Sequence, residues 1–387
     1  MNILYLNEPN CIHGFKWIAH FSKNNKCYNI GQKFQHIMFN EKMRQNFYEN
    51  DIKLLSPINS FSISKFWNTI GDFIYLKRTI NKYKIDLIHI MFAEPSALWA
   101  LGKWYLNIPI VLTTRGSDVL LTIPNFKIKK SFFSQFIFNL YKIAFNKVNF
   151  ITCTSKVQEL KIRELLLKDS ASNIKVVRTG VRLDDILNDT KQFMLPTLEG
   201  KKYILFPRQM APIYNHEFSI DSIMLLPPEI KEEYYMVFID INSPNQNYVS
   251  IIKEKIDSIK DTNFVFLEEQ SQKNLFELYK NASLIVMNPL SDGTPVSALE
   301  AMALEIPVIL GPLNYDKDIF EDCIWQFKDW EPVYLTELIT KILTKLSKVE
   351  IEEKTKSAIN KVKKLADFSA QIKEVQQIYN NVINVKV

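Results

Sequence analysis

Two acidic residues and a candidate helix start lie close together in residues 283–310, which read SLIVMNPLSDGTPVSALEAMALEIPVIL. The first acid is Asp292, and the second, Glu300, follows on a stretch of good helix formers. We expect Thr294 to cap this helix and Pro295 to take its first position, which leaves free backbone N–H groups facing outward. Such a helix start attracts phosphate, and carboxylates accept hydrogen bonds from hydroxyl groups. The pattern fits a nucleotide-sugar site. An ordinary βαβ unit with a solvated loop fits it equally well.

Apolar strands and helical patterns alternate along the whole chain, and this alternation predicts an α/β fold with parallel sheets. In the first half we expect strands at 3–6, 84–92, 109–116, 150–155 and 173–180, with a helix from Lys156 to Leu167. In the second half we expect strands at 203–208, 234–241, 263–269, 283–288 and 307–310. The chain therefore reads as two Rossmann-like, doubly wound domains that face a cleft.

The polar stretch from Asn188 to Lys202 contains Pro196 and Gly200 and is the best linker candidate. We place an N-terminal domain at 1–190 and a C-terminal domain at 191–365. Residues 366–387 are expected to form a helix that packs back on the N-terminal domain. Because ligands of open α/β sheets bind at the carboxyl ends of strands, we expect the cleft to be functional.

The composition is that of a globular enzyme. The chain has 387 residues, of which 47% are hydrophobic and 23% charged. Its four cysteines show no paired spacing and read as reduced thiols. The N-terminus reads as a strand instead of a signal peptide, and no apolar run reaches 18 residues. These features predict a cytoplasmic protein, with peripheral attachment to the inner face of the membrane as an option.

Charge is distributed unevenly between the two halves. Residues 1–190 carry 26 Lys and Arg against 14 Asp and Glu, a balance of +12, whereas residues 191–387 carry 22 against 28, a balance of −6. Residues 126–150 interleave five lysines, at 127, 129, 130, 142 and 147, with seven Phe and one Tyr. This composition suits an interfacial helix on anionic lipid; a domain helix with a core-facing aromatic stripe is the equal alternative. No motif for reading nucleic acid accompanies the charge.

Several segments together resemble glycosyltransferase family 4, which has the GT-B fold. The stretch SDGTPVSALEAMA resembles the family's pair of acids with seven residues between them, with Asp292 and Glu300 at the two positions. ILFPRQMAPIYNHEFSIDSI resembles the opening of the donor domain, with Arg208 at the diphosphate-binding Arg. TTRGSDV resembles an N-terminal-domain loop that contains His-Gly-x-Asp, and here Arg115 replaces the His. The resemblance implies a retaining transfer from a nucleoside-diphosphate sugar. It also implies that 1–190 is an acceptor-binding domain and 191–365 a nucleotide-sugar-binding domain.

The chain departs from the family pattern at three places. The Lys that follows the donor-domain Arg is absent, and Pro212 to Asn215 occupy its region. We keep Asn215 as a donor-site candidate and Arg115 as a candidate second positive charge. Of the Gly-rich turn after the first strand, Gly14 alone remains. We keep Gly14 as a further donor-site candidate beside Asn215 and Arg115.

The resemblance implies a role for each matched residue. Arg208 would donate two parallel hydrogen bonds to the diphosphate, which a planar guanidinium does well. Glu300 would accept hydrogen bonds from ribose hydroxyls, and Asp292 would contact hydroxyls of the transferred sugar. The backbone N–H groups of Gly293 and Thr294 would contact sugar or phosphate, with Pro295 beside them. A strand-end Arg in an ion pair, a surface Glu and a helix-capping Asp are the corresponding alternatives.

Other polar residues are weaker candidates. Asp118 would orient the acceptor or contact the sugar, with a helix-capping Asp as the equal alternative. His89 reads as a buried, hydrogen-bonded structural histidine, and Glu94 as a weak cleft candidate. Asp316-Lys317-Asp318 has the form of a metal-binding DxD but reads as a turn with solvated charges. We expect neither a cofactor nor a metal, because the resemblance implies metal-independent chemistry.

The sequence therefore predicts a retaining glycosyltransferase. It would move a hexose-type sugar from a nucleoside-diphosphate sugar to a hydroxyl of a saccharide or lipid-linked acceptor, in surface polysaccharide, lipopolysaccharide or glycolipid assembly. An anionic membrane surface is a predicted partner through 126–150, and nucleic acid is not. The alternatives are a nucleotide-sugar epimerase on the same fold and a non-catalytic nucleotide-sugar-binding subunit.

Overall fold

The structure is a computed structural model, and it describes residues 1–33, 40–129, 131–167, 173–187, 196–240, 243 and 245–384. The chain forms two compact units. Unit 1 consists of Met1–Thr179 and Ala370–Val387, and unit 2 of Gly180–Ser369. Sequence analysis placed the domain limits at residues 190 and 365. Residues 188–195 of the candidate linker and Lys130 lie outside the described residues.

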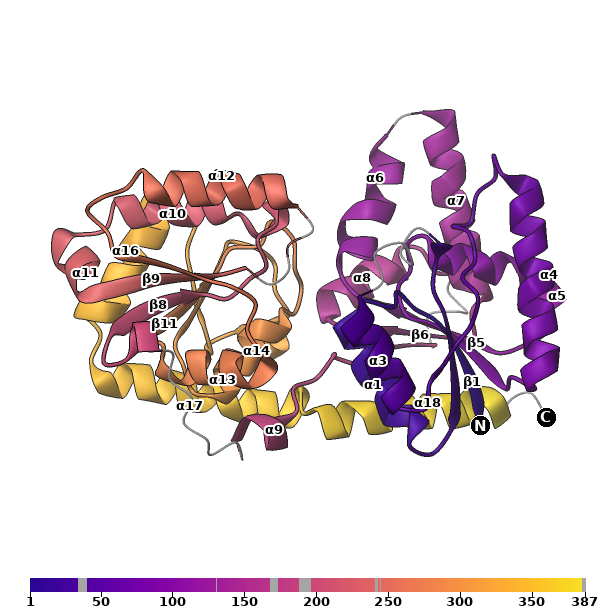
Figure 1. Ribbon diagram of the computed structural model, residues 1–387. Helices are drawn as coiled ribbons and strands as arrows, with labels where there is room; N and C mark the ends of the chain where they lie inside the picture. Colours follow the sequence, from indigo (N-terminus) through magenta and orange to yellow (C-terminus); the bar gives the residue numbers. More distant parts are fainter. Residues whose placement is uncertain are drawn as a thin grey trace. The chain divides into compact units, whose positions relative to one another are not determined.

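A seven-stranded sheet forms the centre of unit 1, in the order β3-β2-β1-β4-β5-β6-β7 (Figure 1). Every neighbouring pair is parallel. The strands are β1 Asn2–Leu6, β2 Lys26–Ile30, β3 Lys53–Leu54, β4 Leu87–Ile90, β5 Ile110–Thr114, β6 Phe150–Cys153 and β7 Ile174–Val176. Sequence analysis did not predict β2 and β3, because Lys26 and Asn29 interrupt the apolar run of β2 and β3 has two residues.

Helices cover both faces of this sheet because alternate strand side chains point to opposite faces. Leu4, Leu6, Ile88 and Ile90 pack with side chains of α4, α7 and α8 on one face. The helical segments are α1 Ile12–Ser22, α3 Glu41–Glu49, α4 Phe66–Tyr83, η1 Ser96–Gly102, α5 Lys103–Leu106, η2 Asp118–Thr122, α6 Ile123–Ile128, α7 Phe132–Lys147, α8 Lys156–Arg163 and α18 Phe368–Asn384.

A six-stranded sheet forms the centre of unit 2, in the order β10-β9-β8-β11-β12-β13, again with every neighbouring pair parallel. The strands are β8 Lys202–Phe206, β9 Tyr234–Ile239, β10 Phe264–Leu267, β11 Leu284–Met287, β12 Val308–Leu310 and β13 Trp325–Gln326. The edge strand β13 was not predicted, since two residues carry no periodic signal.

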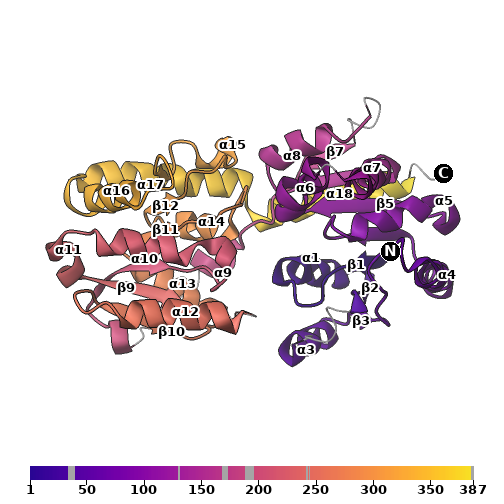
Figure 2. The ribbon, with the colours of Figure 1, turned by 90° about the horizontal axis from the view of Figure 1, so that it is seen from above.

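Helices cover both faces of the unit 2 sheet (Figure 1 and Figure 2), and an apolar core lies on each face. One packs α13, α14 and α17 against the sheet, and the other packs α10, α11, α12 and α16. The helical segments are α9 Leu183–Leu187, η4 Pro196–Leu198, η5 Pro212–Tyr214, α10 His216–Met224, α11 Pro228–Glu233, α12 Gln246–Asp257, α13 Gln272–Asn281, α14 Val296–Ala303, α15 Lys317–Phe320, α16 Pro332–Thr344 and α17 Lys348–Leu365. The predicted fold class, two doubly wound Rossmann-like domains, is confirmed. No described helix is both long and apolar enough to cross a membrane.

A buried polar chain joins α18 to the central strands of unit 1. His89 on β4 is fully buried, and its Nδ1 shares a hydrogen bond of 2.5 Å with the Tyr379 hydroxyl. Its Nε2 lies 2.6 Å from Thr113 Oγ1, which lies 2.6 Å from Thr152 Oγ1. The prediction of a structural histidine at position 89 is confirmed.

The buried histidine makes stability depend on pH. Burial, followed by the charge of Arg115, lowers the pKa of His89 from 6.5 to about 3. The folded state therefore keeps the ring neutral while the unfolded chain binds a proton as the pH falls below about 6.5. We expect the free energy of unfolding to fall between pH 6.5 and 3, by up to roughly 1.4 kcal/mol per pH unit from this group.

Denaturant unfolding of the wild type and His89→Gln at pH 7 and pH 5 measures this contribution. The variant should lose less stability than the wild type over this interval. His20→Gln, a half-exposed position on α1, is the control and should keep the wild-type dependence. Identical pH dependence in the wild type and His89→Gln would contradict the assignment.

Candidate functional site

The chain reverses its direction of winding across the unit 2 sheet between β8 and β11. Strands β9 and β10 lie on one side of β8, and β11 to β13 lie on the other. Ligands of open α/β sheets bind in the crevice outside the carboxyl ends of the strands at such a switch point. Arg208 follows β8, and the loop 288–295 follows β11. Topology alone thus brings two of the predicted segments to the position where a ligand is expected.

Arg208 is held in place on three sides. Its Nη2 lies 3.4 Å from Asp292 Oδ2, and the two side chains are 14% and 20% exposed. The guanidinium carbon lies 4.1 Å from the centre of the Tyr214 ring, which is the geometry of a cation–π contact. His216 Nε2 donates to the Arg208 carbonyl oxygen at 3.2 Å. The structure therefore confines the guanidinium to the end of β8 and pairs it with Asp292, which is also what the alternative of a strand-end Arg in an ion pair expects. The diphosphate contact of Arg208 stays a prediction.

The charges of this pair depend on burial and on each other. Burial works to lower the pKa of Arg208, but Tyr214 and then Asp292 oppose it, and the net direction is upward. Burial raises the pKa of Asp292, while Arg208 and the backbone N–H groups of Gly293 and Thr294 act against that rise. Arg208 therefore stays positive at any physiological pH, as a group that holds an anion must.

The loop between β11 and α14 is tied down by its neighbours. Asn288 Nδ2 donates to Ser219 Oγ at 2.8 Å, and the Leu290 N–H donates to the Ile213 carbonyl at 2.8 Å. On the other side the Asp316 N–H donates to the Gly293 carbonyl at 3.0 Å. The loop thus presents Asp292 from a fixed backbone.

The start of α14 differs by one residue from the prediction. Pro295, with φ −63° and ψ 120°, is the N-cap, and the first helical residue is Val296. The predictions of Thr294 as N-cap and Pro295 as first helical residue are therefore wrong. Proline carries no side-chain acceptor, so no side chain caps the helix. The Thr294 hydroxyl is buried and has no hydrogen-bond partner among the described residues.

Glu300 lies on α14 and is 7% exposed, which excludes the alternative of a surface helix Glu. Gln272 Nε2 on α13 donates to its Oε1 at 3.4 Å. Burial, and then the charge of Glu300, raises the pKa of the Tyr279 hydroxyl, and the charge of Arg208 opposes this rise. Tyr279 therefore interacts electrostatically with both Glu300 and Arg208. A buried carboxylate therefore lies in the same electrostatic neighbourhood as Arg208.

Three tyrosines belong to this site, and sequence analysis did not propose them. Tyr214 stacks on Arg208, and Tyr279 is buried, with the pKa of its hydroxyl raised by burial and then by Glu300 and lowered by Arg208. Tyr315 is buried, and its pKa is raised by burial and then by Asp292. One signal was visible for Tyr214, since it occupies the region where the resemblance expects a Lys. Nothing local in the sequence marks the other two, because only the fold brings them to Arg208.

Two further predictions fall at the edge of this site. Asn215 links η5 to α10 and adopts the left-handed conformation with φ 53°. Asp316 is fully buried at the start of α15, whereas Asp318 is exposed. The prediction that Asp316 is a solvated turn charge is therefore wrong, because the Gly293 carbonyl and the α15 helix fix it against the loop.

Arg115 lies in unit 1, after β5. Its guanidinium carbon lies 4.8 Å from the Trp17 ring centre, and its Nη1 donates to Thr179 Oγ1 at 3.2 Å. Its Nη2 is buried without a hydrogen-bond partner among the described residues. Burial lowers the pKa of Arg115, and nearby groups including Asp118 oppose this. Its role as a second positive charge for the donor stays a prediction.

Asp118 is fully buried and organises the loop around Arg115. Its carboxylate accepts four backbone N–H groups at 2.9–3.2 Å, those of Ala93, Arg115, Gly116 and Val119. A carboxylate so occupied has little capacity left for a ligand. The geometry therefore favours the structural alternative, and contact with acceptor or sugar stays a prediction.

Gly14 lies in α1 and is buried against the loop that follows β1. A Cβ at this position would lie 2.1 Å from Asn7 Oδ1, so only glycine fits the present packing. This close approach accounts for the glycine without a ligand. Its predicted donor contact stays untested.

Groups of His, Cys, Asp and Glu that could hold a metal ion do not occur within the described ranges. The predicted absence of metal and cofactor remains a prediction. The four cysteines form no disulfide.

Comparison with known proteins places the chain in a family. A family model described as Glycosyltransferase Family 4 matches residues 35–185, and one described as Glycosyl transferases group 1 matches residues 188–364. The chain belongs to these glycosyltransferases. The first model falls mainly on unit 1 and the second mainly on unit 2, so the resemblance proposed from the motifs is confirmed. Curated protein sequences give no match.

Solved structures of glycosyltransferases share this GT-B architecture. A glycosyltransferase from Rickettsia africae has 16% identity and a TM-score of 0.76, with 99% of this chain and 98% of that chain covered. Anabaena Alr3699/HepE in complex with UDP has 13% identity and a TM-score of 0.74, with 98% and 100% covered. Sucrose-phosphate synthase from Thermosynechococcus elongatus has 14% identity and a TM-score of 0.70, with both chains covered over 100%. At these identities the likeness shows the fold.

The unpartnered Thr294 hydroxyl gives a stability test. A buried hydroxyl without a partner costs about 1–3 kcal/mol, so Thr294→Val should leave the free energy of unfolding unchanged or raise it by roughly 1 kcal/mol. Thr294→Ser, the control, keeps the hydroxyl and loses a methyl group, and should be less stable than the wild type. Denaturant unfolding measures both. A Val variant that loses more than about 1 kcal/mol would mean that the hydroxyl is bonded within the protein.

Proposed function

We propose that this protein is a retaining glycosyltransferase. It moves a hexose-type sugar from a nucleoside-diphosphate sugar to a hydroxyl of a saccharide or lipid-linked acceptor, in surface polysaccharide or glycolipid assembly. The observation that carries the proposal is the Arg208–Asp292 pair at the switch point of unit 2, beside the uncapped start of α14. Family membership supports transferase chemistry, and retention rests on the family resemblance.

The site suits a ligand that carries phosphate and hydroxyls together. A departing diphosphate must be stabilised, and a fixed guanidinium does this with charge-assisted hydrogen bonds of about 1.5–3 kcal/mol each. The start of α14 adds roughly 0.3–1 kcal/mol. Arg208 is therefore the dominant group for the phosphates. Glu300 accepts from the ribose hydroxyls, and Asp292 accepts from the transferred sugar.

The comparison structures agree with a donor of this class. Structures of HepE contain UDP and UDP-glucose. In this chain the Thr294 hydroxyl and the N–H groups near it lie next to Asp292, where sugar or phosphate oxygens would accept from them. Attack of the acceptor on the same face as the leaving diphosphate would let a diphosphate oxygen take the acceptor proton, so no separate base is required.

Donor binding is tested by thermal shift with UDP-, GDP-, ADP- and dTDP-sugars, because a ligand of the folded state raises the melting temperature. Arg208→Ala should weaken binding of the active donor by roughly ten- to hundred-fold, which corresponds to the loss of one or two charge-assisted bonds. Glu300→Gln keeps the shape and should weaken binding about five-fold. Titration calorimetry gives the constants.

Matched exposed residues of unit 2 serve as controls. Lys348→Ala removes a charge that is 90% exposed, and Glu353→Gln changes an exposed carboxylate on α17. Both should bind like the wild type. Unchanged binding in Arg208→Ala and Glu300→Gln would remove the proposed donor site. Conversion of the free nucleotide sugar without an acceptor would favour the epimerase alternative. Binding of the nucleotide sugar without transfer to any acceptor would favour the non-catalytic subunit.

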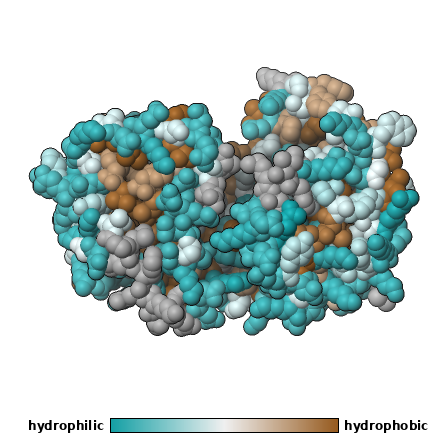
Figure 3. Space-filling view, in the orientation of Figure 1, coloured by the Kyte–Doolittle hydropathy of each residue, from teal (hydrophilic) through white to brown (hydrophobic). Residues whose placement is uncertain are grey.

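A surface of unit 1 supports the membrane partner. Exposed apolar side chains gather at α6 and the start of α7: Ile128 at 72%, Phe132 at 89%, Phe133 at 62% and Phe136 at 43% exposure. Exposed Lys127 and Lys129 lie among them in the sequence. Figure 3 shows the hydrophobic colour at this end of unit 1. Tyr141 and Phe145, farther along α7, are buried in the core. The aromatic side chains that face the core therefore come from the second half of α7, and those of the first half are exposed.

Vesicle co-sedimentation tests this surface. The wild type should bind vesicles that contain anionic lipid, and binding should weaken at high salt because each Lys near the surface contributes about 1 kcal/mol of attraction. The double variant Phe132→Ser and Phe133→Ser should lose most of the binding. Leu160→Ser, a 66% exposed position on α8, is the control. Equal binding of the wild type and the double variant would rule out this surface.

A further inference from the structure

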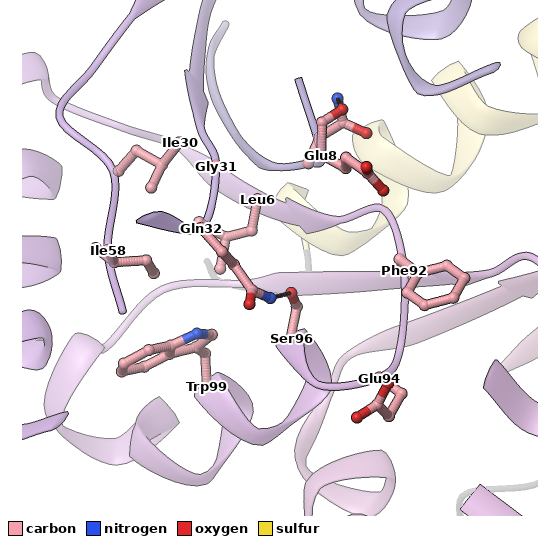
Figure 4. Close-up of a pocket in the computed structure, with 11 residues that line it drawn as sticks. Leu6, Glu8, Ile30, Gly31, Gln32, Ile58, Phe92, Glu94, Ser96 and Trp99 are labelled. Carbon is pink, nitrogen blue, oxygen red and sulfur yellow. Dashed lines mark hydrogen bonds between the residues drawn. The ribbon is translucent and has the colours of Figure 1, made fainter. Parts of the chain in front are cut away.

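The pocket of unit 1 that Figure 4 shows is too small for a substrate. Gln32 after β2, Glu94 after β4 and Trp99 on η1 are among the residues that line it. Gln32 Nε2 donates to Ser96 Oγ at 3.0 Å. The cavity measures about 20 Å³, which is the room that about one water molecule takes. A sugar or a nucleotide therefore does not enter it.

Positive charge is scarce in the donor site of unit 2. Three segments meet there, and they follow β8, β11 and β12 as residues 207–216, 288–300 and 311–318. Their lysine and arginine residues are Arg208 and Lys317, and Lys317 is exposed on α15. Burial lowers the pKa of His216 to about 4, so this ring carries no charge at neutral pH. Phosphates bound at the end of β8 therefore depend on how the Arg208 guanidinium is oriented.

The Tyr214 ring lies against that guanidinium. The guanidinium carbon is 4.1 Å from the ring centre. Burial works to lower the pKa of Arg208, and Tyr214 is the group that opposes this most strongly. A guanidinium is planar and carries its five N–H groups in its own plane. A ring against its face therefore leaves the N–H groups at its edges available to Asp292 and to a ligand.

A short turn with fixed backbone carries this ring. Tyr214 ends η5, and the Ile213 carbonyl accepts from the Leu290 N–H at 2.8 Å, which ties the turn to the loop after β11. On the other side the His216 N–H donates to the Tyr248 hydroxyl at 3.2 Å. The backbone on both sides of Tyr214 is thus attached to other elements of unit 2, so the ring keeps its place when a ligand competes for Arg208.

We propose that Tyr214 is a positioning residue of the donor site, whose ring holds the Arg208 guanidinium so that the N–H groups at its free edge meet the donor phosphates. A guanidinium oriented in advance gives two parallel hydrogen bonds and loses less side-chain freedom on binding. One cation then serves where the family resemblance expects an Arg and a Lys. The inference rests on the proposed function, because it explains how the donor site of that reaction orients its cation.

Removal of the ring tests the inference. Donor binding is measured by titration calorimetry on the full chain, with the nucleotide sugar that gives the largest thermal shift. Tyr214→Leu should weaken binding by about three- to thirty-fold, which is the range of a cation–π contact. Tyr214→Phe keeps the ring and should stay within about two-fold of the wild type. Wild-type binding in Tyr214→Leu, or equal losses in both variants, would overturn the inference.

A matched aromatic residue at the opposite edge of the sheet is the control. Tyr235 lies at the start of β9, and Lys201 Nζ is 4.3 Å from the centre of its ring. Tyr235→Leu therefore removes a similar cation–π contact without touching the carboxyl ends of the strands. It should bind the donor like the wild type.

A fluorinated series separates the charge on the ring face from the shape of the ring. Tyr214→Phe is compared with mono-, di- and trifluorinated phenylalanine at the same position, which keep the ring and weaken the negative charge on its face. The dissociation constant of the donor should rise with each fluorine, by about five-fold in total. The series also decides the question if Tyr214→Leu fails to fold. A constant affinity along the series would show that the ring does not hold the guanidinium by its charge and would overturn the inference.

The same substitution in an Arg208→Ala background separates this inference from the proposed function. Without the guanidinium, Tyr214→Leu should cause no further loss of affinity, because residues that act through one another are not additive. An equal loss in both backgrounds would contradict the positioning role. Weaker binding in Arg208→Ala beside wild-type binding in Tyr214→Leu would overturn this inference alone. Absence of nucleotide-sugar binding in the wild type would instead overturn the proposed function, and the inference with it.

Discussion

The ion pair of Arg208 and Asp292 is the interaction on which the donor site of unit 2 depends. It joins the ends of β8 and β11, two strands that are neighbours in the sheet although Arg208 and Asp292 are far apart in the chain. Removing one partner of a buried pair leaves an unpaired charge at high cost. A ligand phosphate can take the place of the carboxylate as a partner for the guanidinium, which keeps the charge balanced. Tyr214 and His216 hold Arg208 in place for either partner.

Unit 1 uses buried polar groups in a different way. The side chains of His89, Thr113 and Tyr379 form hydrogen bonds with one another inside the protein. The Asp118 carboxylate accepts hydrogen bonds from four backbone N–H groups. In this structure these hydrogen bonds position strands and loops of unit 1. By contrast, the Thr294 hydroxyl of unit 2 is buried without a hydrogen-bond partner among the described residues and keeps capacity for a ligand. Burial together with hydrogen-bond occupancy therefore separates structural from binding residues better than residue type does.

Much of the fold could be read from the chain, because the period of apolar residues in long strands is a local property. The strands around residues 3–6, 203–208 and 283–288 were predicted and are present as β1, β8 and β11. Short or polar strands such as β3 and β13 have no such signal and depend on their neighbours in the sheet. Spacing also misplaced the start of α14 by one residue, in a loop whose Gly293 carbonyl accepts from the Asp316 N–H just before the helix.

The sequence by itself determined the class of fold, the order of its elements and the identity of the acids and the arginine that follow its strands. Spacing along the chain is enough for the elements and the acids, because each depends on residues within one turn or one strand, and the family resemblance added Arg208. Only the tertiary structure decided that Arg208 and Asp292 form an ion pair and that Tyr214, Tyr279 and Tyr315 belong to the same site. It also decided that the Asp118 carboxylate accepts hydrogen bonds from nearby backbone N–H groups. These contacts depend on strand order, and strand order is set by which apolar faces bury each other and not by neighbours in sequence.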